Sequence, residues 1–291
     1  MSEEIRELIC DYRNGNMSRR EFIGRAVALT GSLAAANALF SSLLQSDASA
    51  QVDSSDPAVR WQNIEYTGKA GPVSGYLARP APVGKYPALI IIHANQGLNE
   101  HICDVARRLA KEGYLTLAPD YLSRHGGTKK INPKSQALSN IRELAPWPNV
   151  AENTGSGFSY LRNLSDARDD ALGLMGFCWG GEMTFTAATQ VRGLRAVVVF
   201  YGRSPKPIDM VKSIEAPVLA HYGEKDPGVN QDIPATEEAM KIYNRPYTYK
   251  IYPGAQHGFY NETNAERYHP EAAKEAWEST LDLFKRALQS A

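Results

Sequence analysis

Six short apolar segments alternate along this chain with segments of helical periodicity, and this alternation limits the possible folds more than any other feature. The segment PALIIIH at 87–93 is almost continuously apolar, as expected for a parallel strand buried on both faces. The other predicted strands lie at 114–120, 171–177, 195–202, 216–223 and 247–253. The predicted helices lie at 100–113, 149–164, 181–191, 234–244 and 270–289. Because parallel strands need long, usually helical crossovers, the pattern predicts a doubly wound, mostly parallel α/β sheet with helices on both faces.

Two further segments flank or interrupt this alternation. Residues 64–80 precede the first buried run, and we interpret them as an antiparallel hairpin at the sheet edge. Residues 123–149 are polar, rich in Gly and Pro and longer than an ordinary connection. We therefore expect an excursion over the sheet edge that partly covers a cleft. Residues 51–291 contain no internal repeat and are predicted to form a single α/β domain.

The first fifty residues have a different character from the rest of the chain. Arg19 and Arg20 precede a weakly apolar run rich in Ala, Leu and Gly, and the small residues ASA follow at 48–50. This order of features predicts a twin-arginine export signal over 1–50 that is removed after passage through the twin-arginine export machinery. The alternative is an ordinary amphipathic helix that carries an arginine pair by chance.

Export would make the protein periplasmic or secreted, or anchored to the membrane if the leader is retained. We expect no stable membrane association once the leader is removed, because Ala, Gly and Ser dilute the apolar run below the usual hydrophobicity of a membrane span. The charges balance, with 32 basic and 32 acidic residues, so no basic face for nucleic acid is predicted. Of the three cysteines, Cys10 lies in the leader; Cys103 and Cys178 could pair, but two cysteines are too few for a disulfide scaffold.

The segment GFCWGG at 176–181 follows a predicted buried strand and opens a predicted helix. This strand–turn–helix context, with small residues where backbones crowd, is typical of a nucleophile elbow that exposes its central side chain, here Cys178. The helix N-terminus behind Cys178 would stabilise a thiolate, and the amide of Trp179 would point to a developing oxyanion. The alternative is a structural glycine-rich turn with an inert, buried thiol.

Asp226 and His257 each follow a predicted strand, in the order nucleophile, acid, histidine that is found on α/β-hydrolase sheets. His257 would take the proton of Cys178 or hold it in an ion pair, and Asp226 would fix the tautomer of His257. His221 lies within a strand, so we interpret it as a core histidine.

The motifs GFCWGG, YGEKD and AQHGF, together with the segment HANQGLNEHICDVARRLAKEGYLTLAPDYLSR, resemble the dienelactone hydrolase family over residues 65–288. The resemblance implies an α/β-hydrolase fold and a cysteine-dependent hydrolase of lactones or small esters that needs no cofactor and no metal. It makes Cys178 the nucleophile, Asp226 the acid and His257 the base. The amides of Asn95 and Trp179 would form the oxyanion hole.

Two positions depart from the family pattern. Family members commonly carry a glutamate that holds the resting thiol, and Ala94 stands in its place. Cys178 would then rest as a thiolate paired with His257, or another acid would substitute; Glu100 is nearby in sequence but is better explained as helix N-terminal charge. Asn261 replaces an arginine that grips a substrate carboxylate in muconate-pathway members, which favours a less anionic lactone or ester.

Aromatic residues near the predicted site are candidates for the substrate pocket: Tyr121, Tyr201, Phe259 and Tyr260. Ordinary packing is the alternative for each of them. Glu182 is expected to act through its charge near the helix N-terminus, and Cys103 to lie in the core.

The sequence therefore predicts a hydrolase that works through a Cys–His–Asp triad and an acyl-enzyme intermediate. Two other classes remain open at this point. Ala94 would suit a non-catalytic periplasmic binding or scaffold protein that retains the fold. A thiol redox sensor would use Cys178, but no resolving cysteine lies nearby in sequence, since Cys103 belongs to a different predicted element.

Overall fold

The computed structural model describes residues 4, 5, 8, 11, 17–37, 51–131 and 140–289, and the chain divides into two compact units, Met1–Ala50 and Gln51–Ala291. In the first unit, helix α2 (Arg19–Thr30) has Ser18 as its N-cap residue. The hydroxyl of Ser18 accepts from the amide of Glu21, and the Glu21 carboxylate accepts from the Ser18 amide, which is a capping box. None of the helices described is both long and apolar enough to cross a membrane. The expected cleavage signal at 48–50 lies outside the described residues.

Within the described part of the second unit, the strands form one eight-stranded sheet in the order β1-β2-β4-β3-β5-β6-β7-β8. Its strands are β1 (Val59–Gly68), β2 (Gly71–Pro80), β3 (Tyr86–Ile92), β4 (Leu115–Pro119), β5 (Ala167–Phe177), β6 (Leu194–Phe200), β7 (Val218–Lys225) and β8 (Tyr247–Gln256). The β1–β2 hairpin and the β2–β4 pair are antiparallel, and all other pairs are parallel. The predicted mixed, mostly parallel sheet and its edge hairpin are confirmed.

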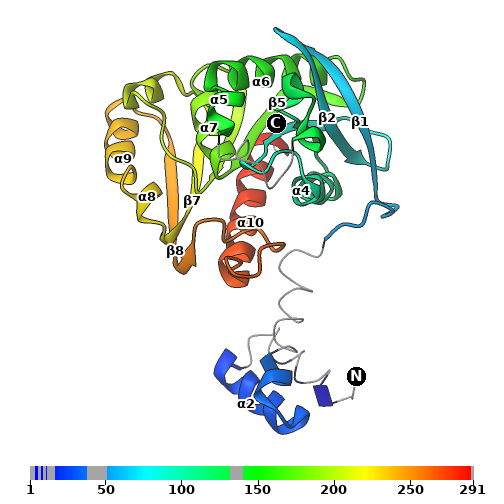
Figure 1. The fold of residues 1–291 in the computed structure, drawn as a ribbon, viewed down its shortest axis with the longest axis vertical. Helices are drawn as coiled ribbons and strands as arrows, with labels where there is room; N and C mark the ends of the chain where they lie inside the picture. The colour runs from blue at the N-terminus through cyan, green and yellow to red at the C-terminus, as the bar shows by residue number, and fades with distance from the viewer. Residues whose placement is uncertain are drawn as a thin grey trace. The chain divides into compact units, whose positions relative to one another are not determined.

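Helices cover both faces of this sheet (Figure 1). One face carries α6 (Trp147–Arg162), α7 (Trp179–Ala188) and α9 (Ile233–Ile242), and the other carries α4 (Glu100–Lys111) and α10 (Pro270–Phe284). Helix α7 begins two residues before the predicted start, directly after Cys178. The predicted helix at 270–289 ends at Phe284 and continues as a π-helical turn, Lys285–Gln289.

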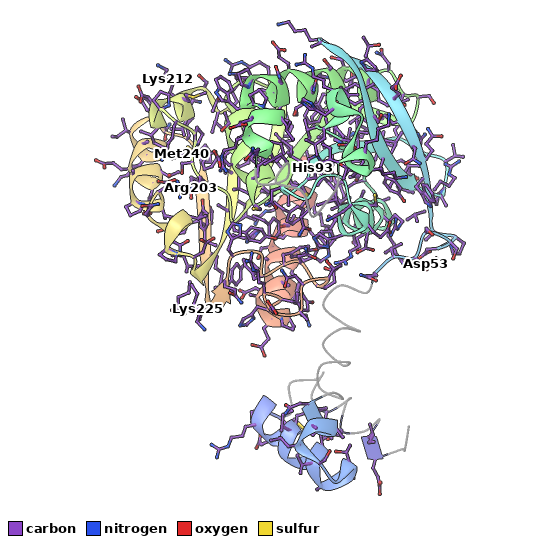
Figure 2. All side chains as sticks on the ribbon, viewed as in Figure 1. Asp53, His93, Arg203, Lys212, Lys225 and Met240 are labelled. Atoms are coloured by element: carbon purple, nitrogen blue, oxygen red, sulfur yellow. The ribbon has the colours of Figure 1, made fainter. Side chains whose placement is uncertain are left out.

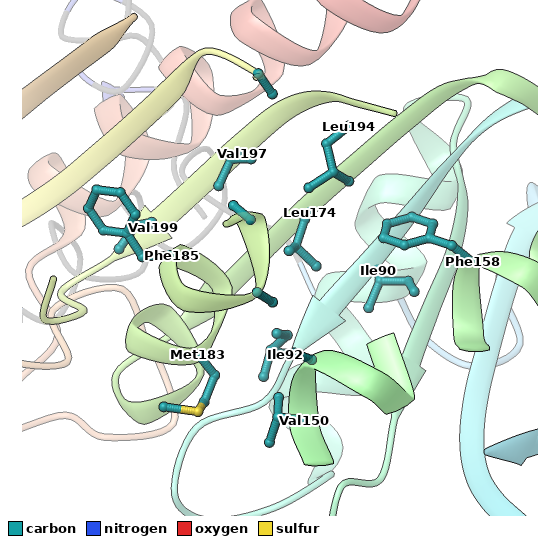
Figure 3. Packing of buried hydrophobic residues seen from close by; sticks show 14 of the residues in the cluster. Ile90, Ile92, Val150, Phe158, Leu174, Met183, Phe185, Leu194, Val197 and Val199 are labelled. Atoms are coloured by element: carbon teal, nitrogen blue, oxygen red, sulfur yellow. The ribbon is translucent and has the colours of Figure 1, made fainter. Parts of the chain in front are cut away.

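Successive side chains of the central strands enter two different cores. Ile90 and Ile92 of β3 pack under α6 and α7 together with Leu174 of β5 (Figure 3), whereas Leu89 and Ile91 pack under α4 and α10. Side chains alternate between the faces of a strand, so a strand covered on both faces must be apolar at every position. This explains the continuous run PALIII. Full burial of each leucine or isoleucine side chain in the run stabilises the fold by about 1.5–3 kcal/mol.

The strand order changes direction around β3. The chain passes from β3 to β4 on one side and then returns to β5 on the other side of β3. At such a switch point the two connections leave in opposite directions and open a crevice outside the carboxyl ends of the strands. Asn95 follows β3 and Cys178 follows β5, so both residues lie at this crevice.

The segment 123–149 is anchored at its start by Asp120, at the end of β4. The carboxylate of Asp120 accepts hydrogen bonds from the amide of Thr128 (2.7 Å) and from its hydroxyl (2.9 Å). The same Thr128 hydroxyl accepts from the amide of Leu98 (2.9 Å), which lies in the loop after β3. The excursion is thus tied to the loop that carries Asn95, and it ends in the short helix α5 (Ile141–Leu144).

Candidate active site

The turn at Cys178 has strained backbone geometry. Cys178 has φ 58° and ψ −119°, a region that residues with a side chain rarely occupy, and its amide donates to the carbonyl of Phe200 (3.0 Å). A Cβ at Gly176 would overlap the carbonyl of Gly180, and a Cβ at Gly180 would overlap the carbonyl oxygens of Ile92 and His93. Glycine is therefore required on both sides of Cys178 for strand, turn and helix to pack this closely.

Three side chains from three strand ends meet at this turn. Nε2 of His257 lies 2.9 Å from Sγ of Cys178, and Nδ1 of His257 lies 2.5 Å from Oδ2 of Asp226. Asp226 is buried and follows β7, while His257 follows β8 and is partly exposed. A carboxylate at Nδ1 holds the proton on that nitrogen or stabilises the imidazolium, and it turns Nε2 toward the sulfur.

The surroundings of Cys178 favour the thiolate. Burial acts to raise its pKa, but the hydrogen bond and charge of His257, with the backbone amides of Trp179 and Asn95, lower that pKa overall. Burial acts to lower the pKa of His257, and the hydrogen bonds to Asp226 and Cys178 raise it to about 9. The pair is therefore biased toward thiolate and imidazolium. The two amides that face Sγ belong to the two residues predicted to form the oxyanion hole.

A cavity of about 220 Å³ opens onto Sγ of Cys178. Five residues expected near the site line it: Asn95, Cys178, Trp179, Tyr201 and His257. Five residues that were not predicted as pocket residues also line it: Ile141, Arg142, Glu182, Arg203 and Val229. Ile141 and Arg142 belong to the excursion, which agrees with the expectation that this segment partly covers a cleft.

Three of the aromatic residues predicted for the pocket do not line this cavity, so that expectation is corrected. Tyr121 is buried, and its hydroxyl is hydrogen-bonded to that of Thr154 (2.8 Å). Phe259 and Tyr260 are fully buried on the α10 side of the sheet, where Tyr260 stacks on Phe177 with ring centroids 5.4 Å apart. The chain turns back to the sheet immediately after His257, so both aromatic side chains enter the core instead of the crevice.

Two histidines near the strand ends are structural. His221 is fully buried, and its ring nitrogens contact the hydroxyls of Tyr252 (3.0 Å) and Thr280 (3.1 Å). Burial lowers the pKa of His221 to about 3, so it is neutral, as predicted for a core histidine. His93 is also buried; Nδ1 donates to the carbonyl of Ala94 (2.8 Å) and Nε2 accepts from the amide of Tyr121 (3.1 Å). His93 thereby joins the loops after β3 and β4.

Glu100, which was considered for the resting thiol, and Glu182, which was expected near the helix N-terminus, both form ion pairs with arginines. Glu100 pairs with Arg107 (2.5 Å), and the side chain at Ala94 packs against the apolar core beside α4. Glu182 lies in the cavity, where it forms an ion pair with Arg142 from α5. The sequence predicted only that Glu182 would place its charge near a helix N-terminus, and this prediction missed the ion pair of Glu182 with Arg142 of the excursion. Across the described ranges, no three His, Cys, Asp or Glu side chains are grouped so that they could hold a metal ion.

A buried ionic cluster fixes the loop that follows His257. The carboxylate of Glu262 accepts from Nδ1 of His101 (3.1 Å) and from Nη2 of Arg108 (3.0 Å), and Arg108 also pairs with Asp104. Burial acts to raise the pKa of Glu262, but His101 and Arg108 lower it to about 2, so its charge persists at neutral pH. Since His101, Asp104 and Arg108 all lie on α4, the cluster connects the histidine loop to the helix after the Asn95 loop.

Comparison with known proteins identifies similar sequences and folds. The sequence model of the dienelactone hydrolase family matches residues 73–288. A protein of Methylorubrum extorquens named "Putative carboxymethylenebutenolidase" is 31% identical over 226 residues, which cover 74% of this chain and 77% of that protein. A protein of the same name from Salmonella typhimurium is 34% identical over 233 residues, which cover 72% of this chain and 81% of that protein. A Klebsiella pneumoniae crystal structure named "Putative Dienelactone Hydrolase" aligns with a TM-score of 0.73 and 30% sequence identity. The alignment covers 79% of this chain and 99% of that chain.

Proposed function

Because this chain belongs to the dienelactone hydrolase family, we propose that it is a cysteine hydrolase that cleaves a small lactone or ester. One observation carries the proposal: the continuous contact from Asp226 through His257 to the sulfur of Cys178, with separations of 2.5 and 2.9 Å. This geometry supplies a nucleophile, a base and a group that orients the base.

In the first half of the proposed reaction, the Cys178 thiolate attacks the carbonyl carbon of the substrate. The carbon–sulfur bond forms as the carbonyl π electrons move to oxygen, and the amides of Asn95 and Trp179 stabilise the oxyanion. When this intermediate collapses, the carbon–oxygen bond to the leaving group breaks. His257 donates its Nε2 proton to the departing alkoxide, which leaves an acyl thioester and a neutral imidazole.

In the second half, neutral His257 takes a proton from a water molecule whose oxygen attacks the thioester carbon. The same two amides bind the second oxyanion, and its collapse expels the thiolate of Cys178. The product is a carboxylic acid, which loses its proton to solvent, and the thiolate–imidazolium pair is restored. In a lactone the alcohol and the acid belong to one product molecule.

Ala94 changes the resting state in this proposal and does not remove the chemistry. No glutamate holds the thiol at that position, so His257 and the amides of Trp179 and Asn95 stabilise the thiolate and the enzyme rests in its reactive form. The redox-sensor alternative has no support from Cys103: burial raises the pKa of Cys103 to about 12, and Cys103 and Cys178 are each free thiols. A non-catalytic binding protein would not require the lowered pKa of Cys178.

Trapping the acyl-enzyme tests the proposal directly. Acid quenching during turnover of p-nitrophenyl acetate, followed by peptide mass spectrometry, is expected to find an acetyl group on the peptide that contains Cys178. The adduct should form with the p-nitrophenolate burst and be removed by hydroxylamine at neutral pH, as a thioester is. The peptide with Cys103 serves as the internal control. Turnover without an adduct, or equal acetylation of Cys103, would rule out the proposed intermediate.

We further propose that residues 1–50 direct export by the twin-arginine route, since Arg19 and Arg20 precede a weakly apolar run. Expressed in a bacterium with that machinery, the wild-type chain is expected outside the cytoplasm with an N-terminus near Gln51. Replacing both Arg19 and Arg20 by lysine should leave the full-length chain in the cytoplasm. Cell fractionation measures the location of each chain and N-terminal sequencing measures its cleavage. Arg25→Lys is the matched control. Identical distributions for all three chains would exclude this route.

A further inference from the structure

The cavity beside Cys178 contains two arginines in different electrostatic situations. Arg142 forms an ion pair with Glu182, so its charge is compensated within the cavity. Arg203 is half-buried, and among the described residues no carboxylate oxygen lies within 4.0 Å of its guanidinium. The segment 132–139 contains neither Asp nor Glu, so its sequence offers no carboxylate partner either.

The backbone that carries Arg203 is held firmly against the nucleophile turn. Arg203 follows the end of β6 and is labelled in Figure 2. The neighbouring Gly202 packs so closely on Gly181 that a Cβ there would overlap its backbone, and the amide of Tyr201 donates to the carbonyl of His221 (2.7 Å). On the other side, the buried Ser204 hydroxyl is hydrogen-bonded to Thr236 of α9. The backbone position from which the Arg203 side chain extends is therefore fixed relative to Cys178.

The guanidinium of Arg203 and the carboxylate of Asp226 both lie near Gly228. Nη2 of Arg203 and Oδ1 of Asp226 lie 3.9 and 4.0 Å from the point where a Cβ of Gly228 would stand. The two groups are nevertheless more than 4.0 Å apart, and Asp226 uses Oδ2 for His257. The guanidinium thus has no carboxylate partner among the described residues and lines the same cavity as Cys178, and its planar set of donors suits bidentate binding of a carboxylate.

We propose that Arg203 determines substrate specificity by binding a carboxylate on the substrate while Cys178 attacks the ester or lactone carbonyl; this inference rests on the proposed function. A half-buried cation attracts an anion more strongly than a fully solvated one does, because less water screens the pair. The loss of arginine at Asn261 suggested a less anionic substrate, but Arg203 supplies a cation from a different loop, after β6 instead of after β8.

The test compares two esters that differ only in charge: the p-nitrophenyl monoester of glutaric acid, which carries a free carboxylate, and the corresponding methyl p-nitrophenyl glutarate. For the wild type we expect a higher kcat/KM with the carboxylate ester, through a lower KM, and a preference that decreases as salt is added. Arg203→Gln should lower kcat/KM for the carboxylate ester roughly 10- to 100-fold and leave the neutral ester nearly unchanged. Arg203→Lys should restore part of the preference, because it returns the charge without the planar donors.

Arg195→Gln is the matched control, since it removes the same charge from an exposed position near the start of β6. Equal losses on both esters in Arg203→Gln would overturn the inference, because they would show that Arg203 only positions Asp226. A wild type that does not distinguish the esters would also overturn it, while the Cys178 thioester would still support hydrolysis. Conversely, hydrolysis of both esters by Cys178→Ala at the wild-type rate would refute the proposed function itself.

Discussion

Replacing Cys178 by alanine is expected to lower the rate of ester hydrolysis by about 10⁴-fold or more, because no other group in the cavity can form the thioester. Alanine removes the sulfur that His257 and the two amides of Asn95 and Trp179 face. What remains is the cavity with the two amides proposed to bind the oxyanion, and such groups by themselves give only weak catalysis. The measurement is kcat/KM for p-nitrophenyl acetate at neutral pH.

The fold should survive this substitution. Cys178 already occupies positive φ with a Cβ, so alanine adds no new backbone strain, and the glycines that the turn requires are unchanged. Circular dichroism and thermal unfolding should match the wild type closely. Cys103→Ala is the matched control, since it removes a thiol on α4 that does not line the cavity, and it should retain turnover. If Cys178→Ala kept activity within tenfold of the wild type, Cys178 could not be the nucleophile.

Replacing His257 by glutamine is expected to lower hydrolysis by about 10³- to 10⁴-fold and to raise the pKa of Cys178. In the wild type, burial acts to raise that pKa, and the hydrogen bond and charge of His257 outweigh it. Without His257, burial dominates and the thiol holds its proton to higher pH. Alkylation by iodoacetamide reports the thiolate, so its pH profile should move to higher pH in the variant.

The wild-type pH profile follows from the same two groups. As pH falls, protonation of the Cys178 thiolate removes the nucleophile, so the rate decreases. As pH rises through about 9, His257 loses the proton that it must donate to the leaving alkoxide, so the rate decreases again. His125→Gln, an exposed histidine of the excursion, should leave both profiles unchanged. An alkylation profile unaltered by His257→Gln would contradict the thiolate–imidazolium pair.

The sheet and the turn at Cys178 could be predicted because both depend on local patterns. A strand covered on both faces must be apolar at every position, so β3 is visible as a continuous run. The turn at Cys178 needs glycine where backbones touch, at Gly176 and Gly180, so it is visible as a motif. The ends of β7 and β8 then locate Asp226 and His257 at one edge of the sheet, as parallel strands require.

The direction of side chains beyond a strand end could not be predicted in the same way. Phe259 and Tyr260 follow closely after His257, yet they are buried in the core beside α10, and the loop that continues from them is held at α4 by the contacts of Glu262 with His101 and Arg108. These contacts join residues more than 150 positions apart, and no local periodicity reports them.

By itself, the sequence determined the α/β sheet, its covered faces and the three strand ends from which Cys178, Asp226 and His257 come, because periodicity and steric demands on glycine are local properties. Only the tertiary structure decided which other side chains share the cavity. It brought Arg142 from the excursion to Glu182 and left Arg203 without a carboxylate partner among the described residues. The physical reason is that the conformation of a loop is set by what it packs against, and those partners are distant along the chain.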